Sequence, residues 1–168
     1  RLIQATYFAI SCGNTNSSSD VWGGSLPYLQ SVSSPYDKNV SGYKRTATFS
    51  QAEVISKIRS STGINLDPEH PEEWFEVLTY TAGGYNGTVR INGLDGSTTK
   101  TGRYLRENVF GLRSACFTYE AVGNNIVFTT YGYGHGVGMS QMGANQYAMN
   151  GWSYTSILTH YYTGISIS

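Results

Sequence analysis

The glycine-rich segment Tyr131–Met139, YGYGHGVGM, constrains this fold more than any other stretch of the chain. Every second residue from 132 to 138 is glycine. The backbone can therefore take positive φ or lie flat against a ligand, because no Cβ stands in the way. A strand-like run precedes the segment, and a helical pattern follows from about Ser140 to Asn150, ending at Gly151. The sequence thus predicts a strand, a tight polar loop carrying His135, and a helix N-terminus in direct succession.

The rest of the chain predicts an α+β fold of mainly antiparallel strands and hairpins, with three to four short helices around one groove. A single domain over residues 1–168 accounts for the length. Expected strands cover residues 3–11, 45–50, 74–82, 88–92, 117–122 and 126–131, with hairpin turns at 86–87 and 123–125. Residues 12–20 read as a loop, and 21–37 as irregular structure. Expected helices run from the Ser50/Glu53 capping box to Gly63, over 102–110 after Thr101, and from Ser153 to Tyr162.

Composition favours a neutral partner over a polyanion. Only 13% of the 168 residues are charged and the formal net charge is zero, so nothing attracts nucleic acid or an acidic membrane surface. The 14 tyrosines and 20 glycines suit a sugar-binding cleft, where flat amphipathic rings and close backbone approach are needed. A tyrosine-rich β domain without that function is the alternative interpretation.

The loop places one imidazole beside a helix N-terminus, whose free N–H groups can bind carboxylate or carbonyl oxygens. His135 would lie in this polar cradle, with Ser140 and Gln141 at its mouth. The competing interpretation is that His135 only hydrogen-bonds the neighbouring loop backbone. Tyr147, Met142, Met149 and His160 fit core packing better than ligand binding.

Acids and metal ligands are not grouped in the sequence. The 11 carboxylates are scattered, none lies in the glycine-rich loop, and Glu107 reads as a solvated charge on a helix. No spacing suggests the two-carboxylate pair of a typical glycosidase. His135 and His160 lack a matching cysteine or carboxylate pattern, so we predict no metal and no cofactor.

The two cysteines, Cys12 and Cys116, leave two interpretations open. Two buried free thiols are favoured, and a disulfide is the alternative if the fold brings the residues together. A thiolate–imidazole pair of Cys12 with His135, as in cysteine hydrolases, is disfavoured because no helix N-terminus follows Cys12 to lower its pKa.

Three segments together resemble the signature blocks of the stage II sporulation protein D family, also called the SpoIID/LytB domain. They are ATYFAISCGNTNSSSDVWGGSLPYLQSVSSPYD, GLRSACFTYE and YGHGVGMSQMGANQYAMNGWSYTSILTHYYTG. The resemblance implies a lytic transglycosylase that cleaves peptidoglycan glycan strands stripped of stem peptides by a partner amidase. Some relatives are described only as amidase enhancers. It also implies an extracytoplasmic, cell-wall-facing protein whose parent is anchored to the membrane.

Two departures from the family pattern matter. Cys12 and Asn14 occupy the variable and second-glycine positions of Ser-x-Gly-Gly-x-Thr, and Asn14 tolerates the left-handed geometry of that turn. The family's general-acid glutamate is expected upstream of Arg1. This chain would then supply most of the substrate groove and no catalytic residue.

The expected substrate-binding set spans the first block and the glycine-rich loop. His135, Ser140 and Gln141 would orient the N-acetyl and lactyl groups, and the tyrosine rings would face the sugars. The full set is Ser11, Asn14, Thr15, Tyr131, Tyr133, Gly134, His135, Gly136, Ser140 and Gln141. A non-catalytic peptidoglycan-binding or amidase-enhancing module is the first alternative, and a cysteine hydrolase is the second.

Overall fold

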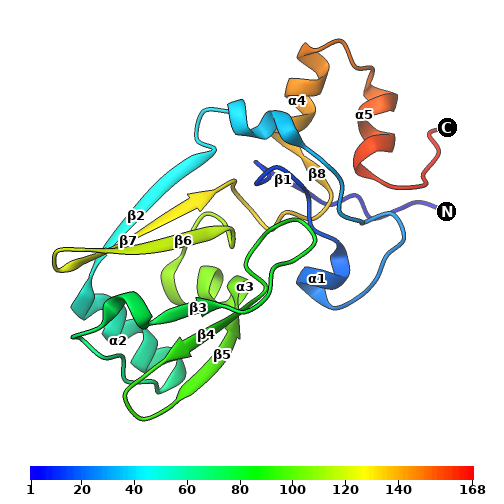
Figure 1. The fold of residues 1–168 in the computed structure, drawn as a ribbon. Coiled ribbons are helices and arrows are strands. Elements are labelled where there is room, and N and C mark those ends of the chain that lie inside the picture. Colours follow the sequence, from blue (N-terminus) through cyan, green and yellow to red (C-terminus); the bar gives the residue numbers. More distant parts are fainter.

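The computed structural model describes residues 1–168 and has an α+β fold (Figure 1). Its elements in chain order are β1 (Tyr7–Phe8), α1 (Ser18–Trp22), the 3₁₀ turn η1 (Pro35–Asn39), β2 (Lys44–Ser50), α2 (Gln51–Thr62), the 3₁₀ turn η2 (Pro71–Glu73), β3 (Phe75–Val77), β4 (Thr88–Asn92), β5 (Ser97–Thr101), α3 (Gly102–Tyr104), the π-helical turn η3 (Leu105–Phe110), β6 (Phe117–Val122), β7 (Asn125–Tyr131), β8 (Met139–Ser140), α4 (Gln141–Met149) and α5 (Tyr154–Tyr161).

The larger of two hydrophobic cores lies among two antiparallel sheets and the helix α2. The sheets have the strand orders β2-β7-β6 and β3-β4-β5. Along β7 every second side chain is buried, including Ile126 and Phe128, as expected for a strand with one face on a core. From α2, Val54 and Ile58 complete this core.

The smaller core joins the C-terminal helices to the N-terminal part of the chain. Tyr147 of α4 and Tyr161 of α5 pack with Leu29 and with Val137 of the glycine-rich loop. The short strands β1 and β8 pair in parallel beside this core. In Figure 1, α4 and α5 stand at one end of the molecule and α2 at the other, so the β1–β8 region lies between the two cores.

Several sequence predictions are confirmed by local contacts. Ser50 caps α2 by accepting from the Glu53 N–H at 3.1 Å, and Gly63 ends the helix at φ 77°. Thr101 and Ser153 cap α3 and α5 in the same way. The hairpin of β6 and β7 pairs Phe117 with Thr130 through Val122 with Asn125.

Other predictions were wrong. A short helix and a polar edge strand were missed because their sequences are polar, and part of one expected strand is a loop. Of residues 3–11, only Tyr7–Phe8 forms a strand. The neighbouring glycine-rich segment does not provide a continuous row of backbone hydrogen bonds for a longer one. The helix α1 begins at Ser18, inside the expected loop at 12–20, and is capped by Ser17. The polar edge strand β5 gave no hydrophobic signal. In addition, Met142 and Met149 are exposed, whereas Tyr147 is buried as predicted.

The segment between β3 and β4 also differs from expectation. The strand predicted over 74–82 ends at Val77, and Asn86-Gly87 is not a two-residue hairpin turn. Instead, the side chain of Asn86 is buried and donates to the Phe117 carbonyl at 2.9 Å, while the Gly87 N–H donates to the Thr79 carbonyl at 2.8 Å. Residues 78–87 therefore form a longer loop that folds against β6.

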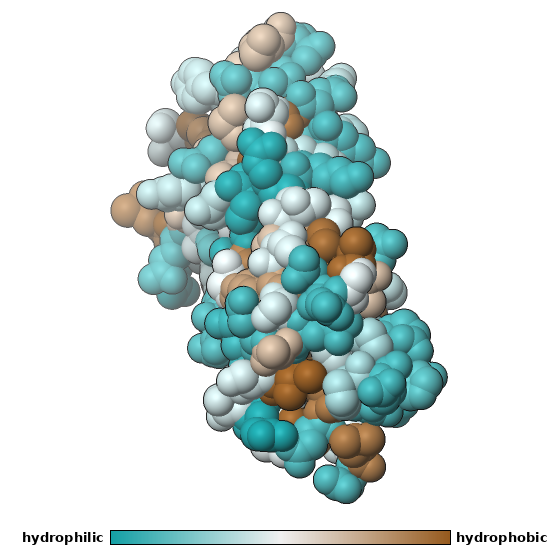
Figure 2. Space-filling view, turned by 90° about the vertical axis from the view of Figure 1, so that its left-hand side faces the viewer, coloured by the Kyte–Doolittle hydropathy of each residue, from teal (hydrophilic) through white to brown (hydrophobic).

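The face of the molecule drawn in Figure 2 is mainly hydrophilic. Figure 2 shows an elongated face on which hydrophobic side chains form separate small patches. The longest helix, α2, has 12 residues, and no helix has both the length and the hydrophobicity needed to cross a membrane.

Candidate functional site

The glycine-rich loop lies against the chain's own N-terminal segment. Tyr133 and Ile10 exchange both backbone hydrogen bonds at 2.7 and 3.1 Å. All four glycines from 132 to 138 have positive φ, which is one of the two roles that the sequence allows for them. A Cβ on Gly134 would meet the Phe8 side chain, and one on Gly138 would meet the Thr6 carbonyl. The missing side chains therefore allow close approach to the protein's own backbone, and the loop holds the first and third signature blocks together.

The N-terminus of α4 is occupied by a carboxylate from the protein itself. Asp37 is fully buried, and its Oδ2 accepts from the Ser140 hydroxyl and from the Ser11 N–H, both at 2.6 Å. Its Oδ1 accepts from the Ser34 hydroxyl at 2.7 Å. Ser140 also caps α4 by accepting from the Gly143 N–H at 3.1 Å. The polar cradle predicted at this helix end exists, but Asp37 fills it.

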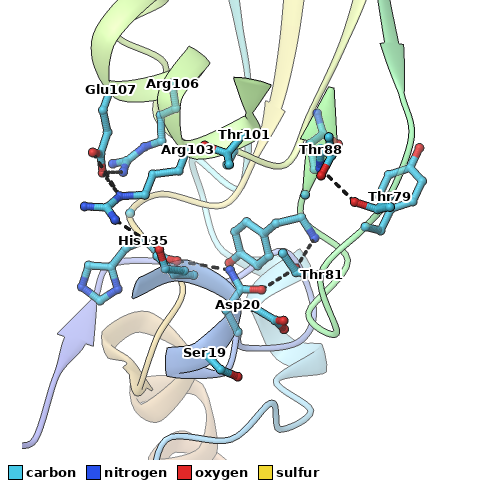
Figure 3. A pocket seen from close by; sticks show the side chains of 18 residues that line it. Ser19, Asp20, Thr79, Thr81, Thr88, Thr101, Arg103, Arg106, Glu107 and His135 are labelled. Atoms are coloured by element: carbon cyan, nitrogen blue, oxygen red, sulfur yellow. Dashed lines mark hydrogen bonds and ion pairs between the residues drawn. The ribbon is translucent and has the colours of Figure 1, made fainter. Parts of the chain in front are cut away.

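A cavity of about 300 Å³ opens on the other side of the loop (Figure 3). One wall is α1, with Ser19 and Asp20, and a second is the loop and strand start over 79–88. The third wall comes from β5, α3 and η3, and carries Arg103, Arg106 and Glu107. Gly134 and His135 lie at its edge, so parts of the chain far apart in sequence share one hollow.

Asn16 fixes two walls of the cavity relative to each other. Its side chain is almost fully buried, donates to the His135 carbonyl at 3.2 Å, and accepts from the Thr81 hydroxyl at 2.5 Å. Thr81 in turn accepts from the Tyr85 N–H at 3.1 Å. The position of His135 therefore depends on the 81–85 turn.

The charged wall is held by ion pairs. Glu107 accepts from the Arg103 Nε at 3.2 Å and from the Arg106 Nη1 at 3.4 Å. Arg103 also donates to the Val21 carbonyl of α1 at 3.1 Å, which ties this wall to the opposite one. Across the cavity, Asp20 accepts from the Ala82 N–H at 3.1 Å. The two guanidinium groups balance the two carboxylates, so the cavity carries no net charge with His135 neutral.

His135 is packed as a neutral ring. Its ring centroid lies 5.6 Å from that of Phe8 and 5.1 Å from that of Trp22, and its Nδ1 accepts from the Val137 N–H at 3.0 Å. Burial, helped by the charge of Arg106, lowers the pKa of His135 below its ordinary value. The imidazole thus makes the loop-backbone hydrogen bond that the simpler interpretation expects, while also lining the cavity.

This lowered pKa predicts an acid-sensitive contribution to stability. Below the ordinary histidine pKa of about 6.5, the unfolded chain binds a proton at His135 that the folded chain resists. The free energy of unfolding should therefore fall as the pH drops from about 7 to 5. In His135→Gln that fall should be shallower, measured by urea unfolding at each pH.

His70→Gln is the matched control. His70 is exposed, and its hydrogen bond with Glu72 raises its pKa, so its contribution is present at low pH and lost as the pH rises. Replacing His70 should therefore not make the fall in the free energy of unfolding between about pH 7 and 5 any shallower. If the free energy of unfolding fell equally steeply between about pH 7 and 5 in the wild type and in His135→Gln, the prediction would be contradicted.

Three residues of the predicted substrate-binding set are buried in structural contacts. Ser11 and Ser140 are fully buried around Asp37. Thr15 is also fully buried, and its hydroxyl accepts from the Val32 N–H at 2.9 Å. A ligand in the cavity does not reach these side chains.

The remaining members of the set lie near the loop but mostly outside the cavity. Gly134 and His135 line it, and the Gly136 carbonyl accepts from the Asn16 N–H at 2.7 Å. Tyr133 stacks with the Arg113 guanidinium at 4.0 Å, and Tyr131 packs against Tyr43 with ring centroids 5.7 Å apart.

Gln141 and Asn14 are exposed and also lie outside the cavity. The left-handed turn expected at Asn14 is made by Gly13, at φ 119°, so the asparagine needs no unusual geometry.

The thiolate–imidazole pair considered for Cys12 and His135 does not form. The Cys12 thiol donates to the Gly83 carbonyl at 3.2 Å. His135 instead contacts Val137, Phe8 and Trp22.

Most of the cavity's polar side chains could not be identified as site residues from the sequence. Asp20 and Glu107 lie 87 positions apart in the chain and face one hollow only after folding. Asn16 stands in a run of small polar residues that resembles an ordinary loop. A signal does exist for Asp20, because Ser17 followed three residues later by an acid is a helix-start pattern.

Comparison with known proteins extends the resemblance over the whole chain. No protein-family model matches it. It is 41% identical over 166 residues to stage II sporulation protein D of Bacillus amyloliquefaciens, and 40% identical over 166 residues to the protein of that name from Bacillus subtilis strain 168. Each match covers 99% of this chain and 45% of the relative. Identity to the amidase enhancer of Bacillus subtilis strain 168 is 27% over 220 residues, covering 99% of this chain and 30% of that protein.

The chain thus spans less than half the length of the relatives it matches. The matches nevertheless include the first and third signature blocks, which meet at the glycine-rich loop, and the second block, which precedes β7. With 41% identity along 99% of its residues, this chain belongs to the stage II sporulation protein D family.

Proposed function

We propose that this chain forms the glycan-binding cleft of a lytic transglycosylase that cleaves denuded peptidoglycan strands during sporulation, outside the cytoplasm. The observation that carries the proposal is the cavity between α1, the 79–88 segment and η3. Of its 18 lining residues only four are hydrophobic, and its volume of about 300 Å³ is at the lower end of ordinary ligand sites. The names of the relatives support the sporulation setting.

The polar lining suits an uncharged sugar rich in hydroxyl and acetamido groups. Ser19, Thr88 and Thr101 offer hydroxyl groups that both donate and accept, and Asp20 offers a carboxylate. Sugar recognition needs this mixture, because every hydroxyl removed from water must find a partner. The balanced charges and the neutral ring of His135 fit the same substrate class.

A lytic transglycosylase requires one acid. The acid protonates the glycosidic oxygen while the C6 hydroxyl of muramic acid attacks C1. The resulting carboxylate accepts the C6 hydroxyl proton, leaving a 1,6-anhydro sugar and a free hydroxyl on the departing chain. No water is consumed and no second carboxylate takes part.

We place this acid on a glutamate outside these 168 residues. Glu107 is engaged by two arginines, and Asp20 holds a backbone N–H of the 78–87 loop. Both carboxylates have positioning partners in the cavity wall. His135 and Gly134 would shape the edge of the cleft, with His135 as a positioning residue.

The proposal can be tested with the full-length protein and denuded glycan strands, by mass spectrometry of the products. Ser19 is exposed on α1 and lines the cavity, so Ser19→Trp should fill part of it. We expect 1,6-anhydro-muramic ends from the wild type, and at least about a 100-fold lower rate from Ser19→Trp, because misplacing the reacting groups by about 1 Å is enough.

Ser60→Trp is the matched control, since Ser60 is exposed on α2 and lies outside the cavity. It should cleave at the wild-type rate. Asp20→Asn and Glu107→Gln should still form some anhydro ends, because neither is the proposed acid. If a folded Asp20→Asn variant formed no 1,6-anhydro-muramic ends at all, the acid would instead be a residue of this chain. If Ser19→Trp and the wild type cleaved denuded glycan at equal rates, the proposal that this cavity binds the glycan would be refuted.

A non-catalytic role is the second candidate, favoured by the 27% identity to a protein named amidase enhancer. In that case the cavity would hold glycan for a cell-wall amidase. The full-length protein would then retain denuded glycan in a pull-down, yield no anhydro ends, and raise the rate of the amidase. Ser19→Trp would abolish the retention.

A further inference from the structure

Cys12 and Cys116 meet although 103 residues separate them in the chain. Their thiols lie close enough for each to shift the pKa of the other. The Cys12 sulfur lies 3.2 Å from the Gly83 carbonyl oxygen, and the Cys116 sulfur lies 3.7 Å from that of Gly84. Two consecutive carbonyl groups of one turn therefore contact both sulfurs.

The backbones on both sides of the pair are fixed. The Cys12 N–H donates to the Tyr85 hydroxyl at 3.2 Å, and its carbonyl accepts from the Tyr43 hydroxyl at 3.2 Å. The Cys116 N–H donates to Ser114 Oγ at 3.0 Å, and its carbonyl accepts from the Tyr131 N–H at 2.9 Å. The meeting of the sulfurs is thus set by the fold, because neither cysteine lies on a loosely held segment.

Both side chains remain within reach of a reagent. Each cysteine is half-buried, and both are free thiols. Interaction with the Cys116 thiol lowers the pKa of Cys12, and interaction with Cys12, together with burial, raises the pKa of Cys116. Cys12 is therefore the better nucleophile of the two at neutral pH.

We propose that Cys12 and Cys116 are a modification site at which a disulfide donor, such as a thiol oxidoreductase or a small-molecule disulfide, installs an intramolecular cross-link. The Cys12 thiolate attacks the donor disulfide, forming a mixed disulfide and releasing one donor thiolate. Cys116 loses its proton and attacks the Cys12 sulfur, which forms the cross-link and releases the second donor thiolate. The donor gains two electrons, and its two thiolates take up the two protons.

The cross-link would support one wall of the cavity. The Thr81–Tyr85 turn lies over the two sulfurs, and both its end residues line the cavity. A Cβ at Gly83 would come within 2.6 Å of the Thr15 carbonyl oxygen, so this turn already sits tightly on the segment that follows Cys12. Joining positions 12 and 116 closes a loop of about 100 residues, a length at which a cross-link strongly restricts the unfolded chain.

The experiment compares the folded chain after incubation with oxidised glutathione or with dithiothreitol. Oxidation should reduce the intact mass by about 2 Da and leave no thiol for iodoacetamide in denaturant. The reduced chain should take up two labels. The Tm of the oxidised chain should be higher by about 5–15 °C and return to the starting value on reduction.

Cys12→Ser and Cys116→Ser are the matched controls, and neither should show a reversible rise in Tm. Two alkylatable thiols after oxidation of the wild type would overturn the proposal. A protein carrying two glutathione adducts, or linked only as dimers, would overturn it equally. Since none of these readouts involves glycan, the cross-link and the proposed cleavage activity stand or fall separately.

Discussion

Replacing Asp37 with alanine is expected to lower the free energy of unfolding by about 3–5 kcal/mol. The carboxylate is fully buried and accepts from the Ser11 N–H, the Ser34 hydroxyl and the Ser140 hydroxyl. Its removal leaves these buried donors without their acceptor. Each unsatisfied buried group costs about 1–3 kcal/mol, although the hydroxyl groups can recover part of this by rotating.

The measurement is urea unfolding followed by circular dichroism, with Asp95→Ala as the matched control. Asp95 is exposed in the turn between β4 and β5, so its replacement should change stability by less than about 0.5 kcal/mol. A similar small change in Asp37→Ala would show that the buried carboxylate contributes nothing to the fold.

The Asp37 contacts also explain which parts of the site could be predicted from sequence. Helix caps depend on residues three or four positions apart, so Ser50, Thr101, Ser140 and Ser153 were identifiable from local pattern. The glycine-rich loop was equally local, and its capacity for positive φ was predictable. Each of these features is decided within a few residues of the chain.

The partners of those features were not predictable, because they come from distant segments. The N-terminus of α4 was expected to face a ligand, whereas Asp37, 103 positions before Ser140, occupies it. Asp20 and Glu107 read as unrelated charges and share a cavity. No local periodicity encodes which carboxylate reaches a helix end, since this depends on how η1 packs against α4.

The close packing of η1 on α4 makes Gly143→Ala unfavourable, against the usual helix preference. Alanine normally stabilises an exposed helix position by about 1 kcal/mol relative to glycine. At position 143, however, a Cβ would collide with Asp37 Oδ1, the Tyr161 hydroxyl and Ser34 Oγ at 2.5 Å. All three residues are fully buried, so we expect a net loss of about 2–3 kcal/mol by urea unfolding. Asn145→Ala, at an exposed position of α4, is the control and should be neutral or slightly stabilising.

A double-mutant cycle separates this collision from a general effect on α4. Once Asp37 is replaced by alanine, the Cβ at 143 loses one of its three closest contacts. Gly143→Ala should therefore cost less in the Asp37→Ala background than in the wild type, with a coupling of about 0.5–3 kcal/mol. Strictly additive losses would mean that the two residues act independently, and that Gly143 is required for some reason other than the buried carboxylate. Coupling would instead show that the small residue and the acid form one unit, which fixes the first and third signature blocks together.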